Sequence, residues 1–206
     1  MQLNPHDFVW INDASEIISE QPLPEWVSMQ WNSSLPLIVL RKQQYDGKIV
    51  VGLRGIKRSE RFDVLIDKSS ITHMMNIESL VSNPIELQRS MFIALPQVQV
   101  LLLISQHQWP WKWGVIGSCA YTLVTDIQSM YSDSDLDILI RCPTLQQKED
   151  FAQFAIKANT PLCRIDIYVE TPKGEFSLSE WFKNDQVSLK TATGTILTAF
   201  PWGENI

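Results

Sequence analysis

The segment DSDLDILI, residues 133–140, places three aspartates at every second position, with leucine and isoleucine between and after them. In a β-strand, alternate side chains lie on the same face, so Asp133, Asp135 and Asp137 would share one face and the apolar residues the other. Carboxylates at this spacing repel one another. A folded chain holds them together at low cost only where a cation compensates their charge.

A further aspartate extends this pattern in the segment CRIDIYVETPKGEF. There isoleucine and valine alternate with polar residues that include Asp166, which indicates a second strand with one apolar face. If the two strands are neighbours, the carboxylates of Asp135, Asp137 and Asp166 converge, and oxygen ligands of this kind suit Mg²⁺ or Mn²⁺. Such an ion polarises a phosphoryl oxygen and lowers the pKa of an attacking hydroxyl. The predicted chemistry is therefore phosphoryl-type transfer.

The segment WGVIGSCAYTLVT supplies the other half of such a site. Gly117 and Ser118 follow a strand-like apolar run and open a helix-like one. Glycine lets phosphates approach the backbone, and the serine hydroxyl together with the first amides of a helix can hold their oxygens. Each motif alone is common, and an isolated acidic-apolar-acidic triplet is more often a solvated strand face. Their order, each in its expected secondary structure, favours a nucleotidyltransferase-like site.

The elements that must position these residues predict a two-domain protein of mixed class. Residues 83–206 alternate as strand, glycine turn, helix, acidic strand, helix and strand, which is typical of a sheet covered by helices. Residues 1–82 contain the strand-like runs PLIVLRK and KIVVGLRG, separated by QQYDG, whose Asp-Gly pair is a hairpin signal. We therefore expect an α+β or α/β fold: a small N-terminal accessory domain over 1–82, then a nucleotidyltransferase-like mixed sheet with helices over 83–206.

Composition and charge limit the classes of partner. The 206 residues are 45% hydrophobic and 19% charged, which is globular, and the net charge of -6 argues against general affinity for nucleic acid. The longest apolar run, VQVLLLI, is far shorter than the roughly 20 residues that span a bilayer. The N-terminus lacks the basic and apolar segments of a secretory signal. We expect a cytoplasmic protein that binds neither nucleic acid nor membranes, with Cys119, Cys142 and Cys163 as small buried side chains.

Several longer segments carry a more specific signal. They are PHDFVWI, LPEWV, VGLRGIKRSERF, WGVIGSCAYTL, DSDLDILIRCP, RIDIYVETPKGEFSLSEW and LKTATGTILTAFPW. Over nearly its whole length the chain resembles the malonate decarboxylase holo-acyl-carrier-protein synthases, also called phosphoribosyl-dephospho-CoA transferases. Most of these segments are unspecific individually, and the specificity lies in their combination.

The resemblance implies a reaction. Such enzymes transfer the phosphoribosyl-dephospho-CoA group of 2'-(5''-triphosphoribosyl)-3'-dephospho-CoA to a serine of the acyl carrier protein subunit of malonate decarboxylase and release diphosphate. It implies that Asp135 and Asp137 are catalytic ligands of Mg²⁺ or Mn²⁺. Asp166 would be a third ligand or the base that takes the serine proton, and Gly117 and Ser118 would hold the triphosphate.

The resemblance also suggests roles for basic residues. Between Arg41 and Arg61 the chain has seven lysines and arginines against two acidic residues. In this segment Arg54, Arg58 and Arg61 could bind substrate phosphates or attract an acidic carrier protein, and the alternative is a solvated charged face. Lys190 could neutralise the leaving diphosphate, although a single lysine is more often simply exposed.

Three other functions stay open at this point. The first two are the equivalent transfer to a citrate lyase carrier and the transfer of a plain nucleotide to a protein. The third is a non-catalytic nucleotidyltransferase fold that serves as a binding module. The intact acidic set argues against the module, and the binding of a divalent ion would distinguish an enzyme from it.

Overall fold

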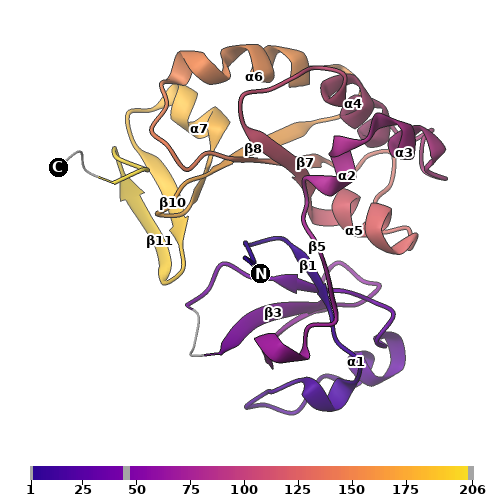
Figure 1. Ribbon diagram of the computed structural model, residues 1–206. Helices are drawn as coiled ribbons and strands as arrows, with labels where there is room; N and C mark the ends of the chain where they lie inside the picture. Colours follow the sequence, from indigo (N-terminus) through magenta and orange to yellow (C-terminus); the bar gives the residue numbers. More distant parts are fainter. Residues whose placement is uncertain (1, 44–46, 204–206) are drawn as a thin grey trace. The chain divides into compact units, whose positions relative to one another are not determined.

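The structure is a computed structural model that describes residues 2–43 and 47–203, and it divides into two compact units, residues 1–76 and 77–206 (Figure 1). The mixture of two sheets and several helices confirms an α+β fold with a small N-terminal domain. The division lies before the boundary predicted after residue 82. The division comes earlier because the short helix α2 (Ser79–Ser82) contacts β6, α3, α4 and α5 of the second unit.

The first unit is an antiparallel sheet of five strands in the order β4-β3-β2-β1-β5. Its elements are β1 (Phe8–Trp10), η1 (Ala14–Glu16), α1 (Glu25–Gln30), β2 (Leu37–Val39), β3 (Lys48–Arg54), β4 (Arg61–Asp67), η2 (Lys68–Ser70) and β5 (His73–Met75). The predicted runs PLIVLRK and KIVVGLRG contain β2 and β3, which pair antiparallel. The turn predicted between them falls partly outside the described residues, because Asp46 is one of those not described.

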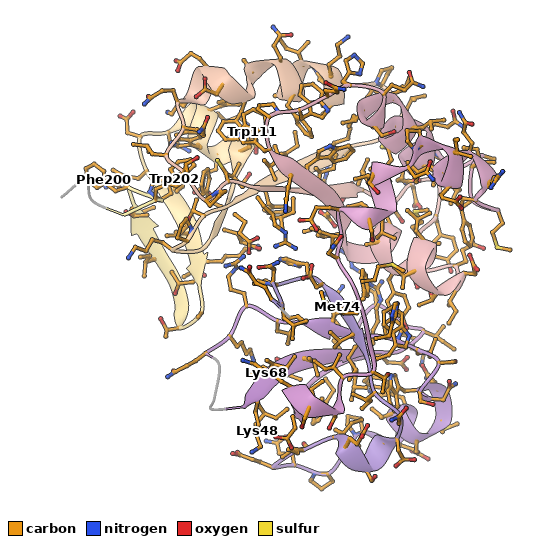
Figure 2. All side chains as sticks on the ribbon, viewed as in Figure 1. Lys48, Lys68, Met74, Trp111, Phe200 and Trp202 are labelled. Carbon is orange, nitrogen blue, oxygen red and sulfur yellow. The ribbon has the colours of Figure 1, made fainter. Side chains whose placement is uncertain are left out.

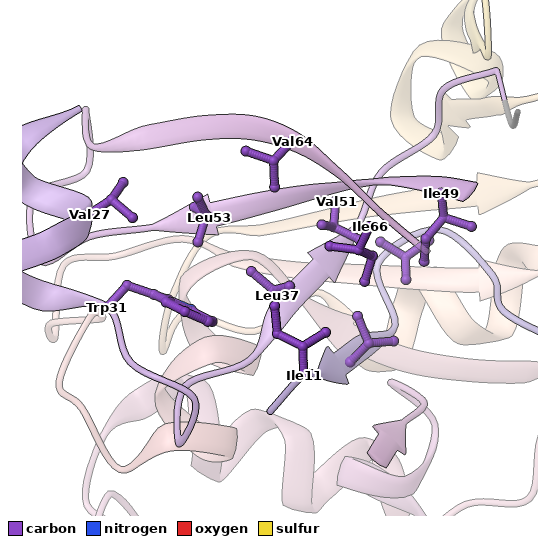
Figure 3. Packing of buried hydrophobic residues seen from close by; sticks show 11 residues of the cluster. Ile11, Val27, Trp31, Leu37, Ile49, Val51, Leu53, Val64 and Ile66 are labelled. Atoms are coloured by element: carbon purple, nitrogen blue, oxygen red, sulfur yellow. The ribbon is translucent and has the colours of Figure 1, made fainter. Parts of the chain in front are cut away.

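The core of the first unit follows from the alternation of its strands. Ile49, Val51 and Leu53, at every second position of β3, are each at most 1% exposed. They pack with Leu37 of β2 and with Trp31, which directly follows α1, in one apolar cluster (Figure 3). Because β-branched and leucine side chains supply one face of each strand, a short helix is enough to complete the core.

The second unit is a mixed sheet of six strands in the order β11-β10-β9-β8-β7-β6, in which only β7 and β8 are parallel. Its strands are β6 (Lys112–Ile116), β7 (Leu136–Arg141), β8 (Ile165–Glu170), β9 (Glu175–Ser177), β10 (Val187–Thr191) and β11 (Gly194–Thr198). Besides α2, its helices are α3 (Pro84–Arg89), α4 (Pro96–Ser105), α5 (Gly117–Thr125), η3 (Lys148–Phe151), α6 (Ala152–Ala158) and α7 (Leu178–Lys183). The predicted order of strand, glycine turn, helix, acidic strand, helix and strand corresponds to β6, α5, β7, α6 and β8.

Aromatic side chains attach the helices α6 and α7 to one face of this sheet (Figure 1). Trp111 stacks on Phe151 with 4.6 Å between ring centroids, and Trp113 of β6 meets Phe154 of α6 edge-on at 5.7 Å. Trp181 of α7 contacts Phe151 at 5.9 Å. The tryptophans of the segment WPWKW therefore pack into the protein, because large rings contribute most of the buried area where helices meet a sheet.

The end of the chain joins the same aromatic layer. Trp202, labelled in Figure 2, lies 5.6 Å from Phe176 and 5.4 Å from Trp181, again between ring centroids. Its indole nitrogen donates a 2.9 Å hydrogen bond to the carbonyl of Cys142. These contacts fix the segment after β11 against the sheet. Among the described residues, no helix has the length and apolar character needed to cross a membrane.

Candidate active site

Strands β7 and β8 are neighbours in the second unit (Figure 1). They pair in parallel, and an aspartate on one lies opposite an aspartate on the other. Asp137 is the second residue of β7 and pairs in register with Asp166, the second residue of β8. Asp135 directly precedes β7 and is two residues before Asp137, so the alternation of an extended chain puts it on the same side. The acidic strands are thus neighbours, which is the condition under which the sequence analysis expects these carboxylates to converge.

The first aspartate of the DSDLDILI segment does not belong to this group. The strand predicted over residues 133–140 begins only at Leu136, and Asp133 lies exposed in a turn before it. Leu139, on the same side of β7 as Asp137, is fully buried. The acidic face of β7 is therefore accessible only at the N-terminal end of the strand.

A guanidinium group compensates two of the three carboxylates. Nη2 of Arg164 donates to Oδ2 of Asp135 and, at 3.1 Å, to Oδ2 of Asp166. The arginine side chain is 69% exposed, and those of the aspartates are 36% and 38% exposed. Arg164 is two residues before Asp166, so it extends from the same side of the chain. One cation thus bridges the two strands at a position that is open to solvent.

Asp137 lies against the glycine that opens helix α5. Gly117 has a φ of +71°, in the left-handed region, and a Cβ built on it would collide with Oδ2 of Asp137. Only glycine tolerates both the dihedral angle and this close approach. Gly117 is exposed and Ser118, the next residue of the helix, is half-buried. The structure therefore brings Gly117, one of the predicted phosphate-binding residues, against Asp137, one of the predicted metal ligands.

The present side-chain positions do not form a complete metal site. Among residues 2–43 and 47–203, no group of three or more His, Cys, Asp or Glu side chains is arranged to hold a metal ion. The reason is local, because Asp135 and Asp166 point to Arg164 while Asp137 lies beside Gly117. The backbone register places Asp137 beside Asp166, while the side chains of the three aspartates are turned to different neighbours.

Two buried polar side chains hold the segment that leads from α5 to Asp135. The hydroxyl of Thr122 in α5 accepts hydrogen bonds from the backbone amides of Ser129 and Met130, at 2.9 and 3.2 Å. The side-chain amide of Gln97 in α4, fully buried, donates to the carbonyl of Ser134 at 2.5 Å and also to that of Tyr131. A long irregular segment thereby delivers Asp135 to a fixed position.

A tyrosine and a lysine extend the acidic face along β8 and β10. Nζ of Lys190 lies 4.9 Å from the ring centroid of Tyr168 and 3.5 Å from Oε1 of Glu175. Burial, and then the charges of Asp137 and Asp166, raise the pKa of the Tyr168 hydroxyl. Its phenol therefore remains a neutral hydrogen-bond donor, and Lys190 is held over its ring beside the carboxylate of Glu175.

A second arginine joins the same strands at their other end. Arg141, the last residue of β7, pairs in register with Glu170, the last residue of β8, and forms ion pairs with both Glu170 and Glu78. These side chains are only 11%, 12% and 20% exposed. Gly114, in the middle of β6, is closely covered as well, because a Cβ there would lie 2.6 Å from the backbone of Ile77.

The predicted basic cluster lies in the first unit, at the hairpin between β3 and β4. Arg54 and Arg61 end and begin these strands directly opposite each other, and Arg58 is exposed in the connecting loop. Glu60 ties the loop by accepting a 2.9 Å hydrogen bond from the amide of Lys57. Arg54 is only 8% exposed, so of the three predicted arginines only Arg58 and Arg61 present their side chains to solvent.

Sequence reasoning assigned no role to three residues that shape the site, namely Arg164, Tyr168 and Gln97. The alternation of residues 164–170 already puts Arg164 and Tyr168 on the face of Asp166, and that pattern was a usable signal. No local signal identifies Gln97. Its partners lie more than thirty residues later in the chain, and only the fold brings them together.

Fold and site together define a two-unit α+β protein whose second unit gathers carboxylates beside a helix opened by glycine. The family models described as the phosphoribosyl-dephospho-CoA transferase MdcG N-terminal domain and C-terminal domain match residues 4–76 and 81–201. The chain belongs to this family, as its motifs predicted.

Curated relatives agree with this assignment over nearly their whole length. A phosphoribosyl-dephospho-CoA transferase from Klebsiella pneumoniae is 39% identical over 198 residues, which cover 96% of this chain and 95% of that protein. The phosphoribosyl-dephospho-CoA transferase of Azotobacter vinelandii is 30% identical, covering 97% and 94%, and one from Pseudomonas fluorescens is 28% identical, covering 96% and 93%. No solved structure matches the chain.

Proposed function

We propose that this protein transfers the phosphoribosyl-dephospho-CoA group from 2'-(5''-triphosphoribosyl)-3'-dephospho-CoA to a serine of the acyl carrier subunit of malonate decarboxylase, with release of diphosphate. Family membership supports the reaction class and a carrier-protein partner. The observation that carries the proposal is the register of Asp137 opposite Asp166, with Asp135 joined to Asp166 through one guanidinium group. This arrangement supports the proposal, because carboxylates gathered on one face suit a cation that also binds a phosphoryl group.

Mg²⁺ or Mn²⁺ is the proposed cofactor, and the residues fit such an ion. Asp135, Asp137 and Asp166 offer only oxygen donors, which hard divalent ions prefer. Two of these carboxylates already share a cation, so their spacing suits a bridging positive charge. When bound, the ion would polarise the phosphoryl oxygen and favour ionisation of the attacking serine hydroxyl. We assign Asp166 as the third ligand because it shares its partner with Asp135.

The other residues of the site bind and orient the donor. Gly117 leaves room for a phosphate beside the carboxylate of Asp137, and the first amides of α5 with the hydroxyl of Ser118 can donate to its oxygens. Lys190 brings a positive charge to the same face, suited to the leaving diphosphate. Tyr168 can donate a hydrogen bond from its neutral phenol. Phosphoryl transfer needs mainly this positioning and charge compensation.

The exposed arginines of the first unit have a separate proposed role. Arg58 and Arg61 present positive charge on a protein whose net charge is -6. They would attract an acidic carrier protein, whose approach the overall charge opposes. Arg54, in contrast, is buried at the end of β3, so we assign it to the packing of the hairpin.

The transfer can be tested by the intact mass of the carrier. The purified protein is incubated with the apo carrier subunit, the triphosphoribosyl donor and Mg²⁺. We expect the carrier to gain the mass of one phosphoribosyl-dephospho-CoA group, and to gain nothing when EDTA is present. Parallel reactions with ATP or CTP as donor, and with a citrate lyase carrier as acceptor, test the specificity. An unmodified malonate decarboxylase carrier would refute the proposal.

A further inference from the structure

A cavity of about 300 Å³ lies among β8, α6 and α7 of the second unit. Its walls are mainly apolar and are formed by Ala155, Ala158, Ile165, Ile167, Leu178 and Phe182. Ile165 and Ile167 alternate with Asp166 along β8, so the cavity lies on the opposite face of this strand from the carboxylates. Phe182 is 39% exposed. An aromatic ring half open to solvent beside an apolar cavity is a usual feature of a small-molecule site.

The cavity and the acidic site meet at the N-terminal end of β8. Cys163 and Arg164, the two residues before this strand, both line the cavity. Arg164 also donates to Asp135 and Asp166, so a single residue belongs to both places. Cys163 also lies within the influence of the acidic site. Burial, and then the charge of Asp135, raise the pKa of its thiol. A ligand with its phosphates at the carboxylates can therefore reach the cavity by passing around the start of β8.

The chemistry of the cavity suits a long, uncharged chain that contains amides. Asn159, Thr160 and Ser179 add a side-chain amide and two hydroxyls to the apolar walls, and none of the described residues that line the cavity is acidic. Apart from Arg164 at the end of the strand, the described residues that line the cavity carry no formal charge at neutral pH. The volume is at the lower limit for sites of small organic ligands. A nucleotide phosphate would find only one cation there, whereas an aliphatic chain with amide groups would find complementary surfaces throughout.

We infer that this cavity binds the pantetheine arm of the dephospho-CoA donor while the triphosphate lies at the carboxylates on the other face of β8. The inference rests on the proposed function, because that function supplies the donor. Pantetheine is an aliphatic chain with two amides, a hydroxyl and two methyl groups, and it carries no charge. Binding energy from this remote arm would hold the reacting phosphate in place without contact at the reaction centre.

Cys163 provides a test in the unmodified protein. Cys119 and Cys142 are buried, and Cys163 is partly exposed, so a maleimide should label Cys163 first. We expect saturating dephospho-CoA, with its thiol capped by methylation, to slow this labelling about tenfold, and ADP at saturation to slow it far less. Peptide mass analysis identifies the labelled residue. Equal protection by both compounds, or protection by neither, would overturn the inference.

A pair of alanines on α6 gives an independent test. Ala155 and Ala152 are both half-buried, but only Ala155 lines the cavity. Ala155→Leu should fill part of the cavity and weaken the binding of S-methyl dephospho-CoA about tenfold in calorimetry, whereas Ala152→Leu should leave it unchanged. Circular dichroism verifies that both variants fold. Equal affinities in the two variants would contradict the inference.

These measurements also separate the inference from the proposed function. The binding of S-methyl dephospho-CoA needs no metal, no carrier and no transfer. If the carrier remains unmodified while Cys163 is protected, the transfer proposal fails and the pantetheine site stands. If the carrier is modified while Cys163 labels at the same rate with and without the compound, the reaction stands and the cavity is not the pantetheine site.

Discussion

The strands β7 and β8 carry an arginine and its carboxylates at each end, and the two ends differ in exposure. At the C-terminal end, Arg141 binds Glu78 and Glu170, and all three side chains are largely buried. At the N-terminal end, Arg164 binds Asp135 and Asp166 and is 69% exposed. The chemical groups at the two ends are the same, whereas the access of solvent is not.

Exposure decides what each cluster can do. A buried arginine cannot leave its carboxylates without leaving charges in a medium of low polarity, so the C-terminal cluster is fixed and structural. An exposed ion pair contributes about 0–1 kcal/mol and exchanges readily with water or ions. This difference in exposure supports the proposal that the N-terminal cluster is the one that binds a metal ion and a triphosphate. The following predictions test this contrast, in order of decreasing effect.

The largest effect is expected from the carboxylates at the exposed end. Asp135→Asn or Asp137→Asn removes a ligand charge and preserves the side-chain shape, so the transfer rate should fall about a thousandfold, while the thermal midpoint changes little. Asp133→Asn is the matched control, because this aspartate of the same motif lies in an exposed turn. Full activity in either site variant would place the metal elsewhere.

At the buried end we expect a loss of stability. Arg141→Met leaves Glu78 and Glu170 buried without their cation, which should lower the free energy of unfolding by about 3–5 kcal/mol. Urea denaturation measures this change. Arg89→Met is the control, since Arg89 pairs with Glu86 at the surface at 3.6 Å and should cost less than about 1 kcal/mol. If the two variants lost the same free energy of unfolding, the buried cluster would be no more fixed than an exposed ion pair, and the distinction between the two clusters would be wrong.

Replacing the exposed arginine should strengthen metal binding. If the proposed ion binds Asp135 and Asp166, Arg164 competes with it for both carboxylates. Arg164→Gln should then increase the affinity for Mn²⁺ about fivefold, which is roughly 1 kcal/mol for a charge at contact in water. Calorimetric titration of the metal gives the dissociation constant, and Arg89→Gln is the control. A weaker affinity in the variant would mean that the guanidinium group organises the carboxylates for the ion and does not compete with it.

The sequence was most informative where the structure depends on neighbouring residues. Alternation along DLDILI and RIDIYVE placed both acidic strands, and the glycine before CAYTL marked the start of α5. The limits of β7 were predicted less accurately. Asp133 continues the alternating pattern of the strand but lies in a turn, which the fold holds and the pattern does not reveal. The domain boundary was also displaced, since α2 joins the second unit through contacts that Pro84 does not reveal.

Contacts between distant residues were outside the reach of sequence patterns. The clamp from Gln97 to the carbonyl of Ser134 spans 37 positions, and the buried state of Arg54 depends on the complete first sheet. The basic segment looked uniform in the sequence, yet the structure separates Arg54 from the exposed Arg58 and Arg61. The sequence also did not reveal that Arg164 binds Asp135, although the alternation of residues 164–170 already places Arg164 on the same face as Asp166.

The smallest effect is expected from Tyr168, which lies between the two ends of β8. Tyr168→Phe removes one hydrogen-bond donor and preserves the ring against Lys190, so the transfer rate should fall about threefold without a change in Mn²⁺ affinity. Burial and the nearby carboxylates raise the pKa of the phenol above its ordinary value of 10.0. The donor therefore stays protonated as the pH rises, and the ratio of wild-type to variant rates should be constant up to about pH 10. Tyr131→Phe, in the exposed turn before Asp135, is the control. A ratio that falls towards one between pH 8 and 9 would show that the hydroxyl ionises early, and the acidic face would then be far less negative than its carboxylates imply.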